Sequence, residues 1–594
     1  MRDAERILSV IRTRGQRGLP LERVYRLLFQ RDLYLRAYAK LYRNAGAMTR
    51  GVTAETVDGM SLAKIDAIIE ALRFERYRWT PVRRTYIPKK NGKLRPLGMP
   101  SWSDKLLQEV LRIILEAYFE PQFSESSHGF RSKRGCHTAL QQVVGHGKGT
   151  KWFIEGDIAS CFDRIDHSVL SKILSERVHD GRFVRLIDGL LKAGYLEDWR
   201  YNASLSGTPQ GGVISPLLAN VVLDKLDKYV EQKLVPANTR GQSRKTHLPY
   251  AALKSAAARA RKVGDLEKAW RLTKASQAIP SRDPEDPDFR RLWYVRYADD
   301  FLLGFIGPKA EALDIKQELS TFLREELRLE LSEQKTLVTH ARDEAAKFLG
   351  YEVHAYHADA KHDHQGRRCI NGGIGLRVPR HVVTAQAEKY MQKGKPIHLK
   401  QRVTDTVYSI VVQYQAEYSG VVQYYRMAYN LHTLGRLRRA AEGSLVKTLA
   451  QKLRLSCAQV YRQFQCDLVT KDGTYKVLEV KQDCGPKKRQ LVAHFGAVPL
   501  KHNEWATVNE SPTRVYSGRS ELLERLLADE CELCGSSEKV EVHHVRKLAD
   551  LKGHSQAEQR MSARRRKTLV VCQRCHNAIH AGRYDGPALV PSEA

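Results

Sequence analysis

The chain has 594 residues, and at roughly 100–200 residues per domain this length predicts about three to five domains. Hydrophobic residues make up 42% of the sequence, which excludes a wholly disordered chain. Lys and Arg number 99 against 67 Asp and Glu, so the net charge of +32 indicates a polyanionic partner, nucleic acid first and an acidic membrane surface second. No run of about 18 apolar residues predicts a membrane-spanning helix, and the N-terminal residues lack the apolar stretch of a secretion signal.

The predicted elements divide the chain into five parts. The first contains short amphipathic helices, the second mixes strands and helices, and the third is helical again. The fourth is mixed and basic, and the fifth contains a cluster of Cys and His. We place these parts at residues 1–80, 81–375, 376–465, 466–515 and 516–594.

Three local patterns in the second part predict its elements. Residues 85–100 predict two short strands around an Asn91-Gly92 turn. Apolar residues then recur at helical spacing after Ser103, which we expect to cap the helix. Residues 152–158 predict a buried strand, and residues 292–305 predict a hairpin.

Residues 236–290 have the composition of a basic insertion. Between 236 and 277, ten Lys or Arg accompany two acidic residues in an Ala-rich helical context. A solvated helical pair and an RNA-binding excursion both fit this pattern, so both alternatives stay open.

Three aspartates lie at the ends of predicted strands. Asp299 and Asp300 stand at the tip of the predicted hairpin, in the sequence YADD, and Asp157 follows another apolar strand. Carboxylates brought together repel one another unless cations hold them, and carboxylate oxygens are the ligands that Mg²⁺ prefers. Two Mg²⁺ ions about 4 Å apart activate an attacking 3′-hydroxyl and stabilise a leaving pyrophosphate, so the pattern indicates nucleotidyl transfer. The alternative is that Asp-Asp serves only as good turn chemistry.

Longer ordered motifs favour the metal site. Over most of its length the sequence resembles the reverse transcriptases encoded by mobile group II introns. The motifs that carry this resemblance are, in order, 84–98 (RTYIPKKNGKLRPLG), 127–131 (SHGFR), 157–162 (DIASCF), 208–220 (TPQGGVISPLLAN), 297–300 (YADD), 334–336 (QKT) and 348–351 (FLGY). The resemblance implies a polymerase in which Asp157, Asp299 and Asp300 bind two Mg²⁺ ions.

The same resemblance assigns the substrate contacts. Lys89 and Arg95 would bind the triphosphate of the incoming deoxynucleotide, where fixed positive charge offsets developing negative charge. Phe162 would pack under the sugar and exclude a 2′-hydroxyl, and Gln210 would support the nucleotide and the template. Lys335, in the QKT motif, is also assigned to substrate binding, and Phe348 to Tyr351 would grip the primer.

Residues 376–465 lack an obvious catalytic pair. Aromatic side chains stand beside Arg at 420–428, a combination suited to stacking on unpaired bases and to phosphate contact. Residues 444–464 alternate leucines and basic residues at helical spacing, which a helical bundle with a basic exterior also explains. Both segments resemble the thumb or X domain of intron maturases, which implies binding of the intron RNA. The candidate RNA contacts are Gln423, Tyr424, Tyr425, Arg426, Lys447 and Lys452.

Four cysteines form two CxxC pairs near the end of the chain. They are Cys531 with Cys534 and Cys572 with Cys575. In a chain without an export signal this spacing favours metal over disulfides. Four thiolates in two such pairs fit a closed tetrahedral Zn²⁺ site. A zinc ribbon that only binds DNA is the alternative.

Histidines around the cysteines argue against a plain ribbon. His543 and His544 are adjacent after a strand-like segment, and His576 and His580 stand four apart on one face of a helix. This order resembles an HNH nuclease. The resemblance implies that His544 is the general base, a role that suits an imidazole titrating at about pH 6.5. It also implies that His543, His576 and His580 surround one divalent metal ion, Mg²⁺.

These patterns together predict a multidomain α+β protein: a right-hand polymerase of fingers and palm, a helical thumb or maturase domain, and a C-terminal zinc-stapled ββα-metal HNH domain. The resemblance implies a multifunctional group II intron-encoded protein that copies intron RNA by target-primed synthesis, promotes splicing and nicks target DNA. Its partners would be group II intron RNA, target DNA and deoxynucleoside triphosphates, with no membrane. The resemblance also implies that residues 466–515 are a DNA-binding region that contacts the target. We expect a bacterial cytoplasmic protein that joins the nucleoid during integration, or an organellar one.

Three other functions stay open on the sequence alone. They are an RNA-binding splicing factor with an inactive polymerase, a stand-alone nuclease on a polymerase-like scaffold, and another bacterial-type reverse transcriptase, such as that of a retron. The intact aspartates at 157, 299 and 300 argue against the first, and the maturase segment with its appended nuclease argues against the last.

Overall fold

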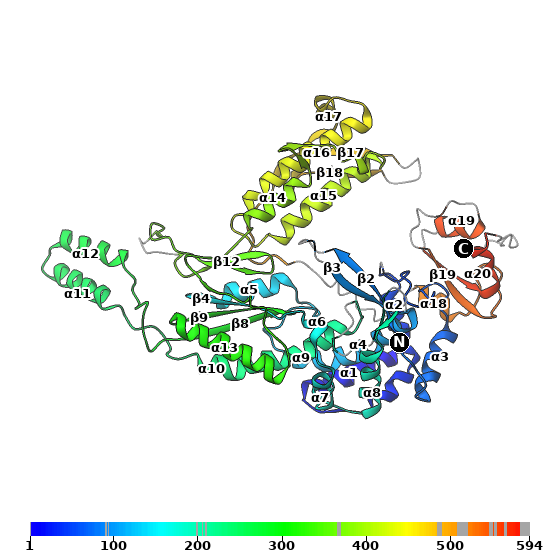
Figure 1. Ribbon diagram of the computed structural model, residues 1–594. Coiled ribbons are helices and arrows are strands. Elements are labelled where there is room, and N and C mark those ends of the chain that lie inside the picture. Colours follow the sequence, from blue (N-terminus) through cyan, green and yellow to red (C-terminus); the bar gives the residue numbers. More distant parts are fainter. Residues whose placement is uncertain are drawn as a thin grey trace.

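The computed structural model of the chain is shown in Figure 1. It describes residues 2–44, 46–88, 92, 94–197, 200–202, 204, 206–207, 211–364, 370–483, 490–507, 521–545, 551, 555–563 and 567–582. Helices and strands are mixed along most of the chain and form several domains, as the sequence predicts. Across these described ranges, no helix combines the length and apolar character that crossing a bilayer requires.

Helices dominate the N-terminal part. They are α1 (Arg2–Gln16), α2 (Arg31–Leu41) and α3 (Leu62–Arg73), and α4 (Trp102–Phe119) of the second part packs against α1 and α2. The helix predicted after Ser103 is α4, and all five apolar residues that predict it, Leu106, Leu107, Val110, Leu111 and Ile114, are fully buried. The predicted cap is wrong, because the helix begins at Trp102 and the Ser103 hydroxyl donates to Glu55 Oε1 at 2.7 Å.

A four-stranded antiparallel sheet in the order β10-β4-β9-β8 forms the centre of the second part. Its strands are β4 (Trp152–Asp157), β8 (Arg291–Tyr297), β9 (Asp300–Ile306) and β10 (Val338–His340). The hairpin predicted at 292–305 is confirmed as β8 and β9. Successive residues of β8 face opposite sides, with Tyr294 in the core that includes the N-terminal helices and Val295 in the core of the third part. The sheet therefore separates two hydrophobic cores and is buried on both faces.

Helices and short strands surround this sheet. The helices are α5 (Cys136–His146), α6 (Cys161–Arg164), α7 (His167–Ser175), α8 (Gly181–Lys192), α9 (Ser215–Tyr229) and α13 (Lys309–Glu326). A second sheet, in the order β3-β2-β6-β7, consists of β2 (Val82–Pro88), β3 (Leu94–Met99), β6 (Tyr195–Glu197) and β7 (Arg200–Asn202). Its β2–β3 pair confirms the two strands predicted at 85–100, while Asn91 of the predicted turn lies outside the described residues.

The basic insertion contains two helices, α11 (Leu248–Lys262) and α12 (Leu266–Ala278), which pack against each other. Figure 1 shows this pair standing away from the central sheet. Leu248, Val263, Leu266 and Trp270 are exposed on it. The helical pair that the sequence predicts is confirmed, and its RNA contact stays a prediction.

The third part packs on the face of the central sheet opposite the N-terminal helices (Figure 1). It contains α14 (Arg380–Glu388), α15 (Val407–Tyr424), α16 (Gly435–Leu453) and α17 (Cys457–Phe464). The fourth part follows with the antiparallel strands β16 (Gln465–Thr470), β17 (Gly473–Gln482) and β18 (Leu491–Phe495). Strand β18 packs along α15, where Gln415 bonds both the N–H and the carbonyl of Gly496. Phe495 also packs on Tyr418, so these strands share one core with the helices.

The C-terminal part combines two antiparallel strands with three helices. The strands are β19 (Val540–His544) and β20 (Thr568–Cys572), and the helices are α18 (Glu521–Leu527), α19 (Gln556–Ala563) and α20 (Gln573–His580). This part docks directly on the N-terminal helices (Figure 1). The Gly59 N–H donates to Val542 O at 3.0 Å, the Val542 N–H donates to Met60 O at 2.8 Å, and Leu522, Leu523 and Leu526 of α18 join the N-terminal core.

Candidate functional site

The three predicted catalytic aspartates lie together at one end of the central sheet. Strands β4 and β9 pair antiparallel, and their register places Asp157 directly opposite Asp300. Asp299 stands in the turn between β8 and β9, and its carbonyl accepts a hydrogen bond from the Ile158 N–H. Two strands that are distant in sequence therefore bring all three carboxyl groups to one place.

The three carboxyl groups of this cluster repel one another when they are ionised. Burial raises the pKa of Asp300 to about 7, with added repulsion from Asp299 and Asp157. Burial also raises the pKa of Asp299, while the charges of Lys335 and Arg95 act in the opposite direction. Lys335 Nζ donates to Asp157 Oδ2 at 2.9 Å. The ionised carboxylates are destabilised here, and nearby cations relieve them.

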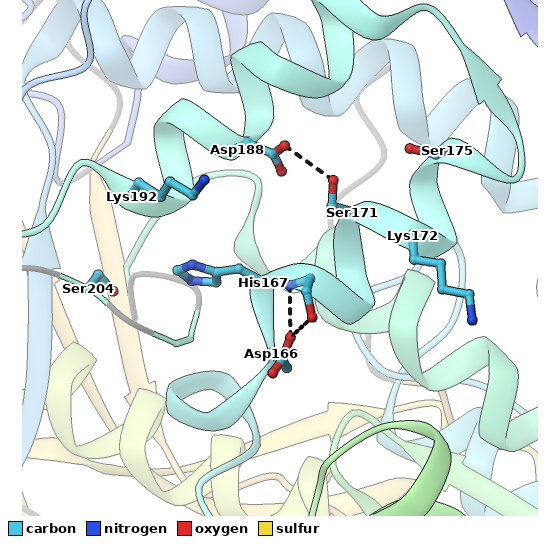
Figure 2. Close-up of a pocket in the computed structure, with 9 residues that line it drawn as sticks. Asp166, His167, Ser171, Lys172, Ser175, Asp188, Lys192 and Ser204 are labelled. Atoms are coloured by element: carbon cyan, nitrogen blue, oxygen red, sulfur yellow. Dashed lines mark hydrogen bonds between the residues drawn. The ribbon is translucent and has the colours of Figure 1, made fainter.

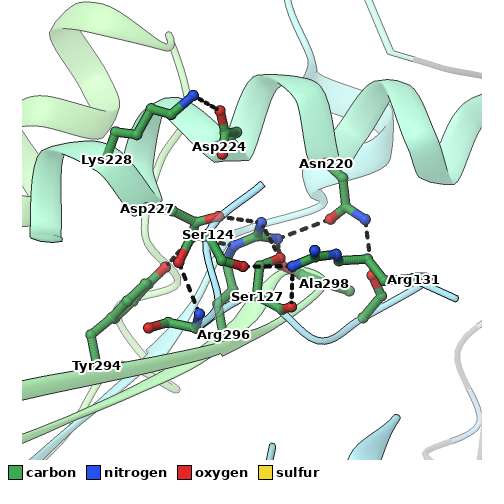
Figure 3. A network of polar contacts seen from close by, with 12 residues as sticks. Ser124, Ser127, Arg131, Asn220, Asp224, Asp227, Lys228, Tyr294, Arg296 and Ala298 are labelled. Atoms are coloured by element: carbon green, nitrogen blue, oxygen red, sulfur yellow. Dashed lines mark hydrogen bonds and ion pairs between the residues drawn. The ribbon is translucent and has the colours of Figure 1, made fainter. Parts of the chain in front are cut away.

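A buried arginine supports the turn that carries Asp299. Figure 3 shows the Arg296 guanidinium beside Asp227, with both side chains fully buried. Its Nε and Nη2 donate to the two carboxylate oxygens of Asp227, each at 2.7 Å, and Nη2 also donates to Ser127 Oγ at 2.8 Å. Its Nη1 donates to Asn220 Oδ1 at 3.1 Å and to Ala298 O at 2.8 Å. One side chain thus joins the SHGFR segment, α9 and the YADD turn.

The SHGFR segment runs against the same turn. The His128 N–H donates to Arg296 O, and the Arg296 N–H donates to Ser126 O. A Cβ at Gly129 would lie 2.3 Å from the Ala298 backbone nitrogen, so only glycine fits there. Sequence analysis missed Arg296 and Asp227 as site residues, and the only signal was that both lie close to recognised motifs.

The structure describes some of the residues that we predict to bind the substrate. Arg95 is exposed on β3, and its charge reaches Asp299. Phe162, on α6, is half-buried and packs edge-to-face on Phe130 with 6.0 Å between ring centroids. Lys89 and Gln210 lie outside the described residues.

Both flanks of the segment that contains Gln210 are anchored. On one side, the Gly207 N–H donates to Ile165 O at 2.8 Å, and His167 Nε2 lies 2.8 Å from Gly207 O. On the other side, Gly211 has a φ of +104° and stands against Gly98 O, which leaves no room for a Cβ. Gly211 therefore lies directly beside β3, the strand of Arg95.

A polar pocket of about 850 Å³ lies between α7 and α8 (Figure 2). Asp166 Oδ1 caps α7 by accepting from the Ser168 and Val169 N–H groups, and Ser171 Oγ donates to Asp188 Oδ2 at 3.2 Å. Lys172 and Lys192 add positive charge. The pocket lining includes none of the three catalytic aspartates, so we do not place the chemistry there.

The predicted primer-gripping residues form a hairpin that contacts the third part. Strands β11 (Ala346–Phe348) and β12 (Tyr351–Ala355) pair, and β13 (Ile374–Arg377) continues the sheet. At the turn, Leu349 O accepts from the Tyr424 hydroxyl at 2.8 Å, and Gly350 O accepts from the Tyr425 hydroxyl at 3.1 Å. Tyr425 is buried, whereas Gln423 is exposed. The two tyrosines therefore join α15 to the hairpin.

The remaining predicted RNA contacts lie on or near α15 and α16. Arg426 is half-buried just beyond α15. Lys447 Nζ donates to Pro396 O at 2.7 Å, and Lys452 Nζ donates to Val403 O at 3.0 Å. Both lysines thus tie α16 to the segment that precedes α15.

The four predicted metal-binding cysteines converge. One sulfur from each of Cys531, Cys534, Cys572 and Cys575 lies within 4.8 Å of the other three. Burial raises the pKa of the Cys575 thiol, and its neighbouring sulfurs add to the effect. Three of the four residues are buried between β20, α20 and the loop before β19, while Cys534 is exposed.

The three predicted metal-binding histidines also converge, and a fourth residue joins them. His543, His576 and His580 place ring nitrogens within 4.8 Å of one another and of a carboxylate oxygen of Asp58, which lies between α2 and α3. Burial lowers the pKa of His576, but hydrogen bonds with Asp58 and Glu541 outweigh this effect and raise the pKa to about 9. Burial also works against ionisation of Asp58, but hydrogen bonds from His576 and the His544 N–H hold its pKa well below the usual range. Sequence analysis missed Asp58.

The predicted general base, His544, lies at the docking surface. Burial lowers the pKa of His544 to about 4, so its imidazole is neutral at physiological pH. Its Nε2 lies 3.3 Å from the Tyr38 hydroxyl, and the rings of Tyr38 and Tyr42 pack against it. The docked arrangement therefore covers this side chain with the N-terminal helices.

Comparison with known proteins identifies three families along the chain. Residues 87–353 match the family described as reverse transcriptase (RNA-dependent DNA polymerase), residues 379–503 match type II intron maturase, and residues 531–576 match AI2M/AI1M-like HNH endonuclease. The chain is 38% identical over 580 residues to the group II intron-encoded protein LtrA of Lactococcus lactis subsp. cremoris, covering 94% of this chain and 95% of LtrA. It is also 31% identical over 593 residues to the putative COX1/OXI3 intron 2 protein of Saccharomyces cerevisiae, covering 96% of this chain and 67% of that protein.

The chain belongs to the group II intron-encoded proteins. This group II intron-encoded protein has reverse transcriptase, maturase and HNH endonuclease domains, so it is an RNA-directed DNA polymerase with an associated nuclease. Asp157, Asp299 and Asp300 lie within the matched reverse transcriptase residues. The four cysteines, His543, His544 and His576 lie within the matched HNH residues, whereas Asp58 lies outside all three matched ranges.

Replacing Arg296 with Met in this group II intron-encoded protein leaves the Asp227 carboxylate buried without its partner. We expect a loss of about 3–5 kcal/mol of stability, measured as a shift in urea unfolding followed by tryptophan fluorescence. Arg291→Met, at the half-buried start of the same strand, should change stability by only about 0.5 kcal/mol. Arg296→Met with Asp227→Leu should recover most of the loss, because neither charge remains. Equal unfolding midpoints for Arg296→Met and Arg291→Met would contradict the role of this pair.

Acidification should weaken the SHGFR segment through His128. Burial lowers the pKa of His128 to about 4, whereas an exposed histidine titrates at about 6.5. Between these values the unfolded chain binds the proton and the folded chain does not, so stability present above pH 6.5 is lost as pH falls toward 4. The contribution of His128 to this loss at pH 5 is about 2 kcal/mol. His128→Gln should remove about 2 kcal/mol from the pH dependence of the unfolding free energy, measured by urea titration. An unchanged dependence would refute the assignment.

Proposed function

We propose that this polymerase uses Asp157, Asp299 and Asp300 to bind two Mg²⁺ ions and to extend a DNA primer on the intron RNA. The observation that carries the proposal is the β4–β9 register, which sets Asp157 against Asp300 beside Asp299. Three crowded carboxylates, two of them with raised pKa values, fit a pair of divalent cations. When bound, such ions activate the primer 3′-hydroxyl and stabilise the leaving pyrophosphate.

The surrounding side chains would position the nucleotide. Arg95 and Lys89, on and next to the β2–β3 pair, would bind the triphosphate of the incoming deoxynucleotide. Phe162, braced by Phe130, would occupy the space of a 2′-hydroxyl. Gln210 would contact the nucleotide and the template. Lys335 would release Asp157 when cations bind and then contact the substrate.

The domains would enclose the duplex as a right hand. The N-terminal helices and the β2–β3 sheet would form the fingers, and the β10-β4-β9-β8 sheet would form the palm. Helices α14–α17 would form the thumb, with β11–β12 gripping the primer where Tyr424 and Tyr425 fasten the hairpin to α15. The intron RNA would contact Gln423, Arg426, Lys447 and Lys452, and binding there would promote splicing by the RNA itself.

The C-terminal domain would nick the target DNA and so supply the primer. The four converging sulfurs fit a structural Zn²⁺ ion that holds β20 and α20 to the loop before β19. His543, His576 and His580 would hold one divalent cation, Mg²⁺, which stabilises charge on the scissile phosphate. His544, neutral at physiological pH, would accept the proton of the attacking water once its Nε2 is released from the Tyr38 hydroxyl. The 3′-hydroxyl left by the nick would prime synthesis on the intron RNA.

The cellular location of the protein can be inferred from the proposed steps of RNA binding, DNA nicking and DNA synthesis. A protein that binds intron RNA and then target DNA works where both are present. We place it in the bacterial cytoplasm at the nucleoid, with an organellar matrix as the equivalent location in eukaryotes.

Asp300→Asn tests the polymerase proposal. Loss of one carboxylate should reduce primer extension on an RNA template by about 10²–10³ while intron splicing by the same protein stays intact. Asp314→Asn, an exposed carboxylate on α13, is the matched control and should extend primers normally. If Asp300→Asn extends primers at the wild-type rate, the metal site is wrong. If wild type itself splices the intron but extends no primer, the protein is a splicing factor without polymerase activity.

His544→Gln tests the nuclease proposal and keeps a hydrogen-bonding group beside Tyr38. Nicking of a target duplex by the ribonucleoprotein should fall by about 10²–10⁴, because the general base is lost. Primer extension from an added oligonucleotide should be unchanged, and Asp300→Asn should show the reverse pattern. Retention of full nicking by His544→Gln would overturn the assignment of the base.

A further inference from the structure

A carboxylate from outside the HNH domain lies among its histidines. His580 Nε2 lies 2.7 Å from Asp58 Oδ2, and His576 Nε2 lies 3.2 Å from Asp58 Oδ1. His543 Nδ1 lies 3.6 Å from the same Oδ1. Four potential ligands therefore surround one point, three from the nuclease and one from the N-terminal part of the chain.

We propose that Asp58 is a fourth ligand of the divalent cation held by His543, His576 and His580, so that one cation ties the nuclease to the N-terminal helices. This inference rests on the proposed nuclease function of the same site. It adds a residue from another domain to that site, about 480 residues earlier in the chain than the first histidine by the numbering of the sequence.

The spacing of the four groups fits a shared ion. Ligands about 2.1 Å from one cation lie roughly 3.0 Å apart in octahedral geometry and roughly 3.4 Å apart in tetrahedral geometry. The contacts to Asp58 span 2.7 to 3.6 Å, and the Nε2 atoms of His576 and His580 lie 3.1 Å apart. Imidazole nitrogens and one carboxylate form a donor set typical of divalent metal sites.

The Nδ1 atom of His543 lacks a hydrogen-bond partner, which indicates that it binds a ligand such as a cation. His543 is only 6% exposed, and its Nδ1 is buried without a hydrogen-bond partner. A buried polar atom left without a partner is costly, so native structures rarely keep one. Because this nitrogen faces Asp58 and the other two histidines, a cation at their centre would satisfy it.

The backbone fixes Asp58 in this position. The His544 N–H donates to Asp58 Oδ1 at 2.7 Å, and the Asp58 N–H donates to Thr56 Oγ1 at 3.2 Å. The next residues, Gly59 and Met60, exchange backbone hydrogen bonds with Val542. The carboxylate is thus held by the strand that carries His543, and its side chain is 14% exposed.

A neighbouring carboxylate orients the central histidine. Glu541 Oε1 lies 2.6 Å from His576 Nδ1, which directs His576 Nε2 toward Asp58. Such a partner on the far nitrogen is typical of metal-binding histidines. The His580 side chain is 53% exposed, so the cation can enter from that side. An octahedral ion held by four protein groups keeps two positions for water or a phosphate oxygen.

The test measures Mn²⁺ binding to the full-length chain by electron paramagnetic resonance. Asp157, Asp299 and Asp300 are changed to Asn in every sample so that the polymerase site is silent, and Mn²⁺ avoids the thiolates. We expect Asp58→Asn to weaken the remaining site at least about tenfold. Asp66→Asn, an exposed carboxylate on α3, should leave it unchanged. Asp58→His, which supplies a ligand nitrogen, should restore most of the affinity.

His543→Ala separates the two proposals. If it abolishes the site while Asp58→Asn binds Mn²⁺ as wild type does, Asp58 is only a hydrogen-bond partner and this inference fails, while the proposed nuclease site stands. If wild type and His543→Ala bind Mn²⁺ equally, no cation occupies the histidines and the proposed nuclease site itself fails.

Hydrogen exchange tests the tie between the domains. Mn²⁺ should slow exchange in peptides that cover residues 57–60 and 540–545 of the wild-type chain. It should not do so in Asp58→Asn. Equal slowing in both proteins would mean that the cation does not join the domains through Asp58, which overturns the inference.

Discussion

The buried pair of Arg296 and Asp227 is the constraint on which the polymerase site depends. A guanidinium with no exposure must satisfy its donors inside the protein, and here they reach four different residues. Those four residues come from α9, from the SHGFR segment and from the turn before Asp299. Because Ala298 O is among the acceptors, the geometry that satisfies the arginine also sets the course of the chain into the two aspartates. The turn that carries Asp299 and Asp300 is thus held by a buried charge of opposite sign.

Both candidate metal sites bring titratable groups close together, like charges in one and imidazoles with a carboxylate in the other. In the polymerase site, three carboxyl groups crowd at the end of two paired strands, and burial keeps Asp300 partly protonated near neutral pH. In the nuclease site, three imidazoles face a single carboxylate, and two of their nitrogens lie 3.1 Å apart. A rigid framework holds each group in place, the central sheet in one case and the docked β19 strand in the other.

Local patterns in the sequence predicted much of this. Alternation and run length placed the hairpin around YADD, and the buried strand before Asp157 made the meeting of three aspartates an expectation. The paired CxxC spacing also predicted that four sulfurs lie together, since each pair sits on one tight local structure.

The parts of the fold and of the sites that could not be predicted depend on contacts between distant segments. Nothing in the sequence around Asp227 marks it as the partner of Arg296, 69 residues later, and Asp58 stands in an unremarkable loop 486 residues before His544, whose N–H it accepts. The packing of β18 on α15 is hidden likewise, because β18 is a short basic-flanked strand whose apolar residues could face several partners.

The docking of the C-terminal domain has a geometric consequence. Val542, Leu522 and their neighbours belong to the same hydrophobic core as the helices beneath the β2–β3 sheet, so the two catalytic centres are built on one continuous support and not on opposite ends of a tether. In this docked arrangement the HNH histidines have a defined place relative to the β10-β4-β9-β8 sheet. The helices between them would then set the length of duplex that separates a nick from the point where copying begins.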